Sequence, residues 1–175
     1  GSASAIEARR VFAGPVLAIV SLCQVFLLSM VVGLKLGPLP VGASPFVKLA
    51  DKFPDAPMLQ VAGFVPADGQ GLNDLLQNPW MTIHPPTLFV GFTLLMVPFA
   101  FAVAGLYRAR YTQWVKPALP WALAGCGVLG VGIMMGGWWA YETLSFGGWW
   151  AWDPVENSSL VPWIFAVAAL HAMVV

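Results

Sequence analysis

The 175-residue chain is 59% hydrophobic and only 9% charged, whereas soluble domains carry about 25% charged residues. This composition excludes an ordinary water-soluble fold. Eight basic and eight acidic residues cancel to a formal net charge of zero, which excludes the basic surface of a nucleic-acid-binding protein.

Four long stretches contain no Asp, Glu, Lys or Arg, namely 11–34, 75–107, 117–141 and 157–175. A helix that crosses a bilayer needs about 20 apolar residues, so the sequence predicts an all-α polytopic membrane protein with four transmembrane helices. We place these helices at 11–34, 85–107, 117–138 and 154–175. The fourth reaches Val175 without a C-terminal capping signal. We therefore expect a segment of a longer chain that forms part of a larger helical bundle.

Charge predicts the side of the membrane on which each connecting segment lies. Basic residues mark cytoplasmic loops, and five of the eight lie before the first helix or between the second and third. Every acidic residue except Glu7 lies in 35–82 or 141–156. We therefore expect cytoplasmic segments at 1–10 and 108–116. The external segments are 35–84, with short amphipathic or interfacial pieces, and the Trp-rich loop 139–153.

Small side chains inside the predicted helices are interpreted as structural. The third helix carries six glycines, Gly125, Gly127, Gly130, Gly132, Gly136 and Gly137. Such residues favour close packing between membrane helices. Cys23 and Cys126 lie in apolar stretches without a CxxC or CxxCH motif, which is typical of buried structural thiols.

His84 precedes the pair Pro85-Pro86 at the outer end of the second predicted helix. Because proline disfavours helical backbone in the preceding residue, we expect residue 84 to be extended, just before the helix begins. A solvated interfacial histidine is one interpretation. Pro85-Pro86 make the backbone next to His84 rigid, and His84 is expected on the same side of the membrane as the Trp-rich loop. These two features favour the interpretation of His84 as a metal ligand.

Nine tryptophans occur in the chain, and five of them lie within fifteen residues: Trp138, Trp139, Trp149, Trp150 and Trp152. Indole rings commonly lie at the membrane surface, which is one interpretation of the group. Three of these indoles follow the pair Gly147-Gly148, and such a loop can lay flat aromatic surface against a large planar apolar ligand. We favour this second interpretation.

The sequence Asp153-Pro154-Val155-Glu156 predicts the start of the fourth helix. Asp is a preferred N-cap, Pro suits the first helical position, and Glu three residues after the cap completes a capping box. The cap is expected to fix the direction in which the Trp-rich loop enters the helix.

His171 lies among apolar residues inside the fourth predicted helix. An ionisable side chain in a membrane span is a functional-site hypothesis, and imidazole can ligate haem iron. The alternative is a neutral histidine bonded to a carbonyl on the next helix. One histidine cannot supply both axial ligands of a haem.

The run GGWWAWDPVENSS at 147–159 resembles the tryptophan-rich "WWD" signature of the haem-handling proteins of cytochrome c biogenesis. Two further runs, GQGLNDLLQNPW at 69–80 and IHPP at 83–86, resemble the CcmF branch, the cytochrome c haem lyase subunit, rather than the CcmC and CcsA branches. The resemblance covers nearly the whole chain from about residue 11 onwards.

The resemblance implies two haem b groups, one in transit at the external Trp-rich loop and one embedded in the membrane. It implies that His84 ligates the iron of the external haem and His171 that of the embedded one. It also implies a haem platform of Trp149, Trp150, Trp152 and Asp153, with further contacts from Trp138, Trp139, Phe146, Gly147 and Gly148. The second histidine of each ligand pair is not in this sequence, and Phe146 replaces the Trp that usually begins the signature.

The resemblance further implies a haem lyase (synthetase) subunit that presents haem for thioether attachment to the CxxCH cysteines of apocytochrome c. It assigns no catalytic residue. Expected partners are apocytochrome c, a periplasmic haem chaperone, a thiol-reducing protein, membrane lipid, and the remaining portion of the chain or a split subunit. The expected location is the bacterial inner membrane, with the N-terminus cytoplasmic and the Trp-rich loop periplasmic.

Two other functions stay open. One is a haem exporter or carrier of the same superfamily without ligation activity, although the run at 69–80 favours the lyase. The other is a transporter or structural membrane subunit whose Trp-rich loop only contacts the membrane surface.

Overall fold

The computed structural model describes residues 2–65, 67–69, 71–143 and 148–175. Its long elements are the helices α1 (Ser2–Val32), α3 (Pro79–Tyr107), α4 (Val115–Thr143) and α5 (Pro154–Val174). Each contains a stretch long and apolar enough to cross a membrane, which in α1 starts at Arg10. This confirms the fold class expected from the four uncharged stretches, an all-α polytopic membrane protein.

The chain divides into two units, Gly1–Val20 with Asn73–Val175, and Ser21–Leu72. After the end of α1, the described residues of the second unit form short elements: β1 (Leu34–Leu36), β2 (Leu39–Val41), α2 (Leu49–Lys52) and the 3-10 helix η1 (Pro57–Gln60). The two strands form an antiparallel hairpin with Leu34 opposite Val41. The hairpin was not predicted, because three-residue strands leave too short a pattern to detect.

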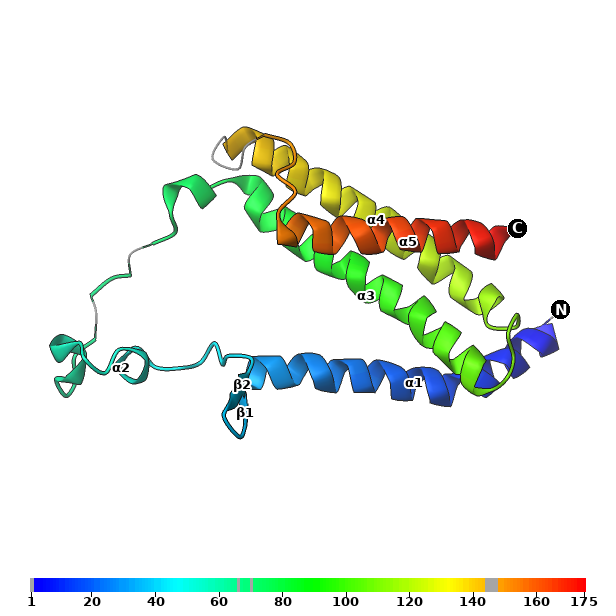
Figure 1. Ribbon diagram of the computed structural model, residues 1–175, viewed down its shortest axis with the longest axis horizontal. Helices are drawn as coiled ribbons and strands as arrows, with labels where there is room; N and C mark the ends of the chain where they lie inside the picture. Colours follow the sequence, from blue (N-terminus) through cyan, green and yellow to red (C-terminus); the bar gives the residue numbers. More distant parts are fainter. Residues whose placement is uncertain (1, 66, 70, 144–147) are drawn as a thin grey trace. The chain divides into compact units, whose positions relative to one another are not determined.

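The first unit begins with the start of α1, followed by the 3-10 helix η2 (Asp74–Leu76) and the helices α3, α4 and α5. These three helices lie side by side, and the start of α3, the end of α4 and the start of α5 meet at one end (Figure 1). This arrangement brings the predicted sites of the second helix and of the Trp-rich loop to the same end of the unit.

Glycines allow α3 and α4 to approach closely. A β-carbon added at Gly91 of α3 would lie 2.6 Å from the α-carbon of Leu129, and one added at Gly132 of α4 would lie 3.1 Å from the α-carbon of Leu88. These positions confirm that glycines of the third predicted helix serve helix packing.

Helix α5 packs on α4 through Trp163. Its indole N–H donates to the backbone carbonyl of Cys126 at 2.9 Å, and a β-carbon at Gly130 would lie 3.0 Å from the indole nitrogen. The Cys126 side chain is buried, whereas that of Cys23 is only partly so. Cys126 therefore fits the structural role expected of it.

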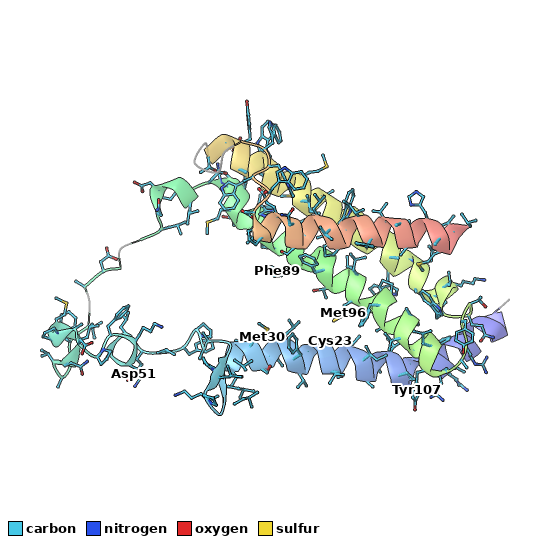
Figure 2. The ribbon with its side chains drawn as sticks, in the orientation of Figure 1. Cys23, Met30, Asp51, Phe89, Met96 and Tyr107 are labelled. Carbon is cyan, nitrogen blue, oxygen red and sulfur yellow. The ribbon has the colours of Figure 1, made fainter. Side chains whose placement is uncertain are left out.

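Apolar side chains cover the outward faces of the long helices (Figure 2). Phe89 on α3 is 67% exposed, and Phe165 on α5 is 72% exposed. Large exposed apolar side chains are expected where a helix faces lipid or another membrane helix.

Candidate functional site

His84 lies inside α3, so the prediction of an extended backbone at this residue is wrong. The helix begins at Pro79, and its N-cap is Asn78, whose Oδ1 accepts a hydrogen bond from the backbone N–H of Trp80 at 2.9 Å. An Asn cap and a Pro at the first helical position are strong start signals. They outweigh the bias that Pro85 places on the backbone of residue 84.

The imidazole of His84 is half-buried between α3 and α4. Its Nδ1 lies 2.7 Å from the carbonyl oxygen of Gly132. Because a carbonyl can only accept, Nδ1 carries a proton in this contact, and in the neutral imidazole Nε2 keeps its lone pair. Within the described residues, no side chain or backbone group hydrogen-bonds to Nε2. The neutral imidazole with its proton on Nδ1 therefore has the nitrogen lone pair that a metal ligand needs.

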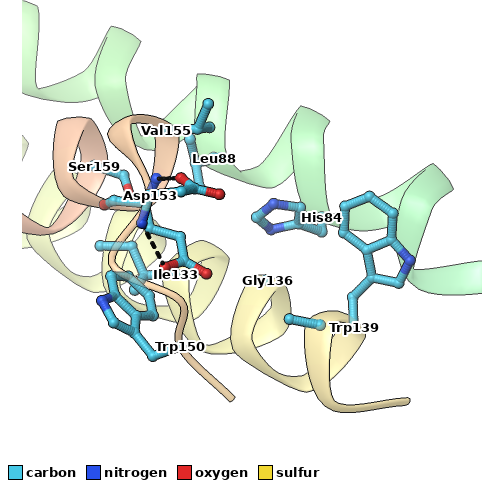
Figure 3. A pocket seen from close by; sticks show the side chains of 11 residues that line it. His84, Leu88, Ile133, Gly136, Trp139, Trp150, Asp153, Val155 and Ser159 are labelled. Atoms are coloured by element: carbon cyan, nitrogen blue, oxygen red, sulfur yellow. Dashed lines mark hydrogen bonds between the residues drawn. The ribbon is translucent and has the colours of Figure 1, made fainter. Parts of the chain in front are cut away.

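A cavity of about 240 Å³ lies beside His84. Figure 3 shows the imidazole between Trp139 of α4 and the first turn of α5, and the centroids of the His84 and Trp139 rings are 6.1 Å apart. The cavity walls come from α3, α4, α5 and the segment before α5. Its lining residues are His84, Leu88, Ile133, Gly136, Trp139, Ala140, Trp150, Asp153, Val155, Glu156 and Ser159.

The cavity combines mostly apolar walls, two indoles and one available imidazole nitrogen. Its other polar side chains, Asp153, Glu156 and Ser159, all come from one side, the start of α5. These side chains suit one part of a planar, largely apolar ligand that carries a metal atom, as a haem does. The cavity of about 240 Å³ is smaller than the roughly 300–1,000 Å³ of a typical ligand pocket, so the rest of such a ligand would extend outside it. His84, Trp139 and Trp150 would hold such a group.

The three tryptophans of segment 148–153 do not all face this cavity. Only Trp150 lines it together with His84. Trp149, Trp150 and Trp152 line a second, more open apolar hollow of about 610 Å³. Trp150 is therefore the member of the predicted platform that both spaces share.

The indole N–H of Trp150 is buried, and it has no hydrogen-bond partner in the described part of the chain. A buried donor without a partner costs about 1–3 kcal/mol, so such a group calls for an explanation. An acceptor atom on a bound ligand would supply the missing partner.

Trp149 attaches the segment to the end of α4. Its ring stacks on Tyr141, with centroids 4.8 Å apart and planes 22° apart. It also meets Trp138 edge-on at 5.3 Å, and a β-carbon at Gly137 would lie 3.2 Å from the Trp149 carbonyl oxygen. Half of the Trp149 surface stays exposed.

The capping box at the start of α5 is confirmed. Asp153 Oδ1 accepts from the N–H of Glu156 at 2.8 Å, and Glu156 Oε2 accepts from the N–H of Asp153 at 3.4 Å. The same Glu156 oxygen also accepts from the N–H of Ala151 at 2.8 Å. Glu156 thus holds both the helix end and the backbone of the preceding segment.

Trp152 has a left-handed backbone, with φ of 58°, which is uncommon for a bulky side chain. The side-chain amide of Asn157 donates to the Trp152 carbonyl at 2.9 Å, and Glu156 holds the neighbouring N–H groups. This turn leaves the Trp152 indole 70% exposed and edge-on to Trp150 at 6.2 Å.

Glu142 connects the ends of two helices. Its Oε1 accepts from the indole N–H of Trp138 at 2.7 Å, and its Oε2 accepts from the side-chain amide of Asn78 at 3.1 Å. Sequence reasoning did not single out Glu142 or Asn78. The sequence signal that was available is Asn before Pro, which indicates an N-cap.

His171 does not belong to this cluster. It is exposed on α5, and its Nδ1 lies 2.7 Å from the carbonyl of Val167 on the same helix. Within the described residues, this bond runs to a carbonyl on its own helix and not to one on a neighbouring helix. His171 lines neither of the hollows around Trp150, and its role as a ligand of an embedded haem stays a prediction.

Phe146 and Gly147 lie outside the described residues. Gly148 has φ of 105°, a conformation that favours glycine. Among the residues that the structure describes, no group of three or more His, Cys, Asp or Glu side chains could hold a metal ion.

A family model described as "Cytochrome C assembly protein" matches residues 3–174. The chain is 43% identical over 112 residues to cytochrome c-type biogenesis protein CcmF of Pseudomonas fluorescens. It is 47% identical over 117 residues to CycK of Rhizobium meliloti and 44% identical over 111 residues to ccl1 of Rhodobacter capsulatus, two further cytochrome c-type biogenesis proteins.

These alignments cover 63%, 65% and 63% of this chain, respectively, and 17% of each relative, so the chain spans only part of the length of the proteins it matches. No solved structure matches. Because the family model covers almost every residue, the chain belongs to the cytochrome c assembly protein family.

Proposed function

We propose that the chain is the haem-binding part of a cytochrome c haem lyase, which presents haem for covalent attachment to apocytochrome c. The observation that carries this proposal is the 2.7 Å contact between His84 Nδ1 and the Gly132 carbonyl, made by an imidazole that lines a cavity together with Trp139 and Trp150. In the neutral imidazole this contact leaves the lone pair of Nε2 for a metal. The names of the relatives, all cytochrome c-type biogenesis proteins, support the same process.

The attachment reaction places specific demands on these residues. A bound haem would supply vinyl groups and an iron atom that accepts axial ligands. Each cysteine thiol adds across a vinyl double bond: a carbon–sulfur bond forms, the π bond breaks, and the thiol hydrogen passes to the other vinyl carbon. The addition consumes no oxidant or reductant. The chain's contribution is therefore to hold and orient the substrate.

His84 would bind the iron of such a haem through Nε2. The indoles of Trp139 and Trp150 would limit rotation of the ring by contact with its faces or edges. We place this site on the periplasmic side of a bacterial inner membrane, with apocytochrome c as the acceptor. A haem chaperone and a thiol-reducing protein are the proposed partners, and a second haem bound by His171 is part of the same proposal.

The test is a pair of measurements on the protein purified from membranes of haem-replete cells. Absorption spectra of the oxidised and dithionite-reduced forms should show noncovalent haem, and His84→Ala should remove the external part of this signal. In cells, His84→Ala should also abolish c-type cytochromes detected by haem staining, while the variant still accumulates in the membrane.

A haem-free unsubstituted protein would overturn the proposal. So would a normal cytochrome yield with His84→Ala. Bound haem that never passes to an added apocytochrome would replace the lyase by a haem carrier.

A further inference from the structure

Glu142, which is not assigned a role by the proposed function, joins two parts of the candidate site. It lies in the last turn of α4, and both of its carboxylate oxygens are engaged. Oε1 accepts from Trp138 at 2.7 Å, and Oε2 accepts from Asn78 at 3.1 Å. Hydrogen bonds to a charged acceptor are stronger than those between neutral groups.

On one side, Glu142 is connected to the helix that carries His84. The Asn78 side chain uses its oxygen to cap α3 through Trp80 and its amide nitrogen to reach Glu142. Both bonds have the correct polarity, so the amide cannot be reversed without losing them. The first turn of α3 is thereby tied to α4, six residues before His84.

On the other side, Glu142 is connected to the segment that carries Trp150. It holds the Trp138 indole, whose ring meets Trp149 edge-on at 5.3 Å. Trp149 precedes Trp150 in the chain, and its contacts with α4 therefore help to position the Trp150 backbone.

We propose that Glu142 is a positioning residue for the ligand bound at His84. It acts by keeping the start of α3 and the Trp149–Trp150 backbone at a fixed separation, without touching the ligand. The inference rests on the proposed function, since it assigns Glu142 to the haem at His84.

The donor and acceptor pattern allows a reciprocal test. Glu142→Gln keeps an oxygen that accepts from Trp138, but its amide N–H then faces the amide N–H of Asn78, and two donors cannot form a hydrogen bond. Asn78→Asp keeps the oxygen that caps α3, but its carboxylate then faces the carboxylate of Glu142, and the hydrogen bond between the two side chains is lost. In the double variant Asn78→Asp/Glu142→Gln, the new amide can donate to the new carboxylate, so the bond between positions 78 and 142 is restored with its direction reversed. The bonds donated by the Trp138 indole and the Trp80 backbone keep their direction. Asp55→Asn, which removes an exposed carboxylate of the other unit, is the control.

The readout is haem titration of the purified, unloaded full protein followed by absorption. Each single variant should bind the His84 haem about 10- to 100-fold more weakly, as is typical when a residue that orients a metal ligand is changed. The double variant should recover most of this loss, and Asp55→Asn should match the unsubstituted protein. The spectrum of the haem assigned to His171 should stay the same in every variant.

Equal loss of both haem signals in the single variants would show that Glu142 serves folding alone and would overturn the inference. A double variant as weak as the two single variants combined would also overturn it. If the unsubstituted protein binds no haem, the proposed function fails instead. Amide hydrogen exchange at 80–84 then tests the connection itself: faster exchange in each single variant and recovery in the double variant support it, and unchanged exchange overturns it.

Discussion

The two histidines of the chain lie in the same unit but are held in different ways. His84 is half-buried, and its Nδ1 is bonded to the Gly132 carbonyl on a neighbouring helix. His171 is exposed, and its Nδ1 is bonded to Val167 on its own helix. Tertiary packing therefore fixes the first ring, whereas the second is oriented by α5 alone.

This difference shows what each region needs in order to work. Around His84, residues from α3, α4 and α5 already form a cavity. Around His171, the exposed surface of α5 must face lipid or protein that the described residues do not include. We therefore expect the His84 region to respond to small steric changes within this chain, and the His171 region to be insensitive to them.

The largest expected effect comes from removing each imidazole in turn. His84→Ala should eliminate the external haem signal and leave the embedded one, and His171→Ala should do the reverse, because each removes one proposed axial ligand. Reduced-minus-oxidised absorption spectra of the two purified variants provide the measurement. Loss of both signals in either variant would contradict the assignment of the two histidines to two separate haems.

A smaller loss of haem binding is expected from adding one methyl group at Gly136, next to Cε1 of the His84 ring. A β-carbon at Gly136 would lie 2.6 Å from His84 Cε1, so Gly136→Ala must displace the imidazole and should weaken haem binding about 10- to 100-fold. Gly127 has no atom within 4 Å of its added β-carbon, and Gly127→Ala should bind normally. Equal affinities of the two variants in haem titrations would contradict the observed packing.

A change at Trp150 should have a moderate effect. Trp150→Phe keeps an aromatic ring but removes the unpaired N–H, so haem affinity should fall about tenfold if that donor bonds to the ligand. Trp149→Phe is the matched variant, since Trp149 does not line the cavity, and its effect on affinity should be smaller.

The smallest effect is expected for Asn157→Ala, which removes the bond that holds the Trp152 carbonyl. The free energy of unfolding should fall by about 1 kcal/mol, the usual contribution of one hydrogen bond. Ser158→Ala removes only a local bond to Val155 and is the control. If the two variants unfold alike in a detergent titration, the left-handed turn at Trp152 does not depend on Asn157.

The sequence predicted the long helices and the start of α5 because both depend on local patterns. Uncharged runs mark the membrane spans, and Asp153 and Glu156 have the spacing of a capping box, which the structure contains. The start of α3 was placed too late, because the bias of Pro85 was given more weight than the cap formed by Asn78.

The contacts that define the candidate site could not be predicted from local patterns in the sequence. The bonds from Asn78 to Glu142 and from His84 to Gly132 join residues 64 and 48 positions apart. They arise only when α3 and α4 pack together, and no local pattern encodes the register of that packing. The different surroundings of Trp149 and Trp150 likewise depend on the end of α4.

The partner of His84 is a main-chain oxygen, and this has a consequence for how the site can change by mutation. No substitution at residue 132 deletes the acceptor; a larger side chain can only push α3 away through Leu88. Natural variation at this position is therefore constrained by size and not by chemical type. A comparison of variants that searches for an acidic or amide partner of the histidine would overlook the atom that sets its tautomer.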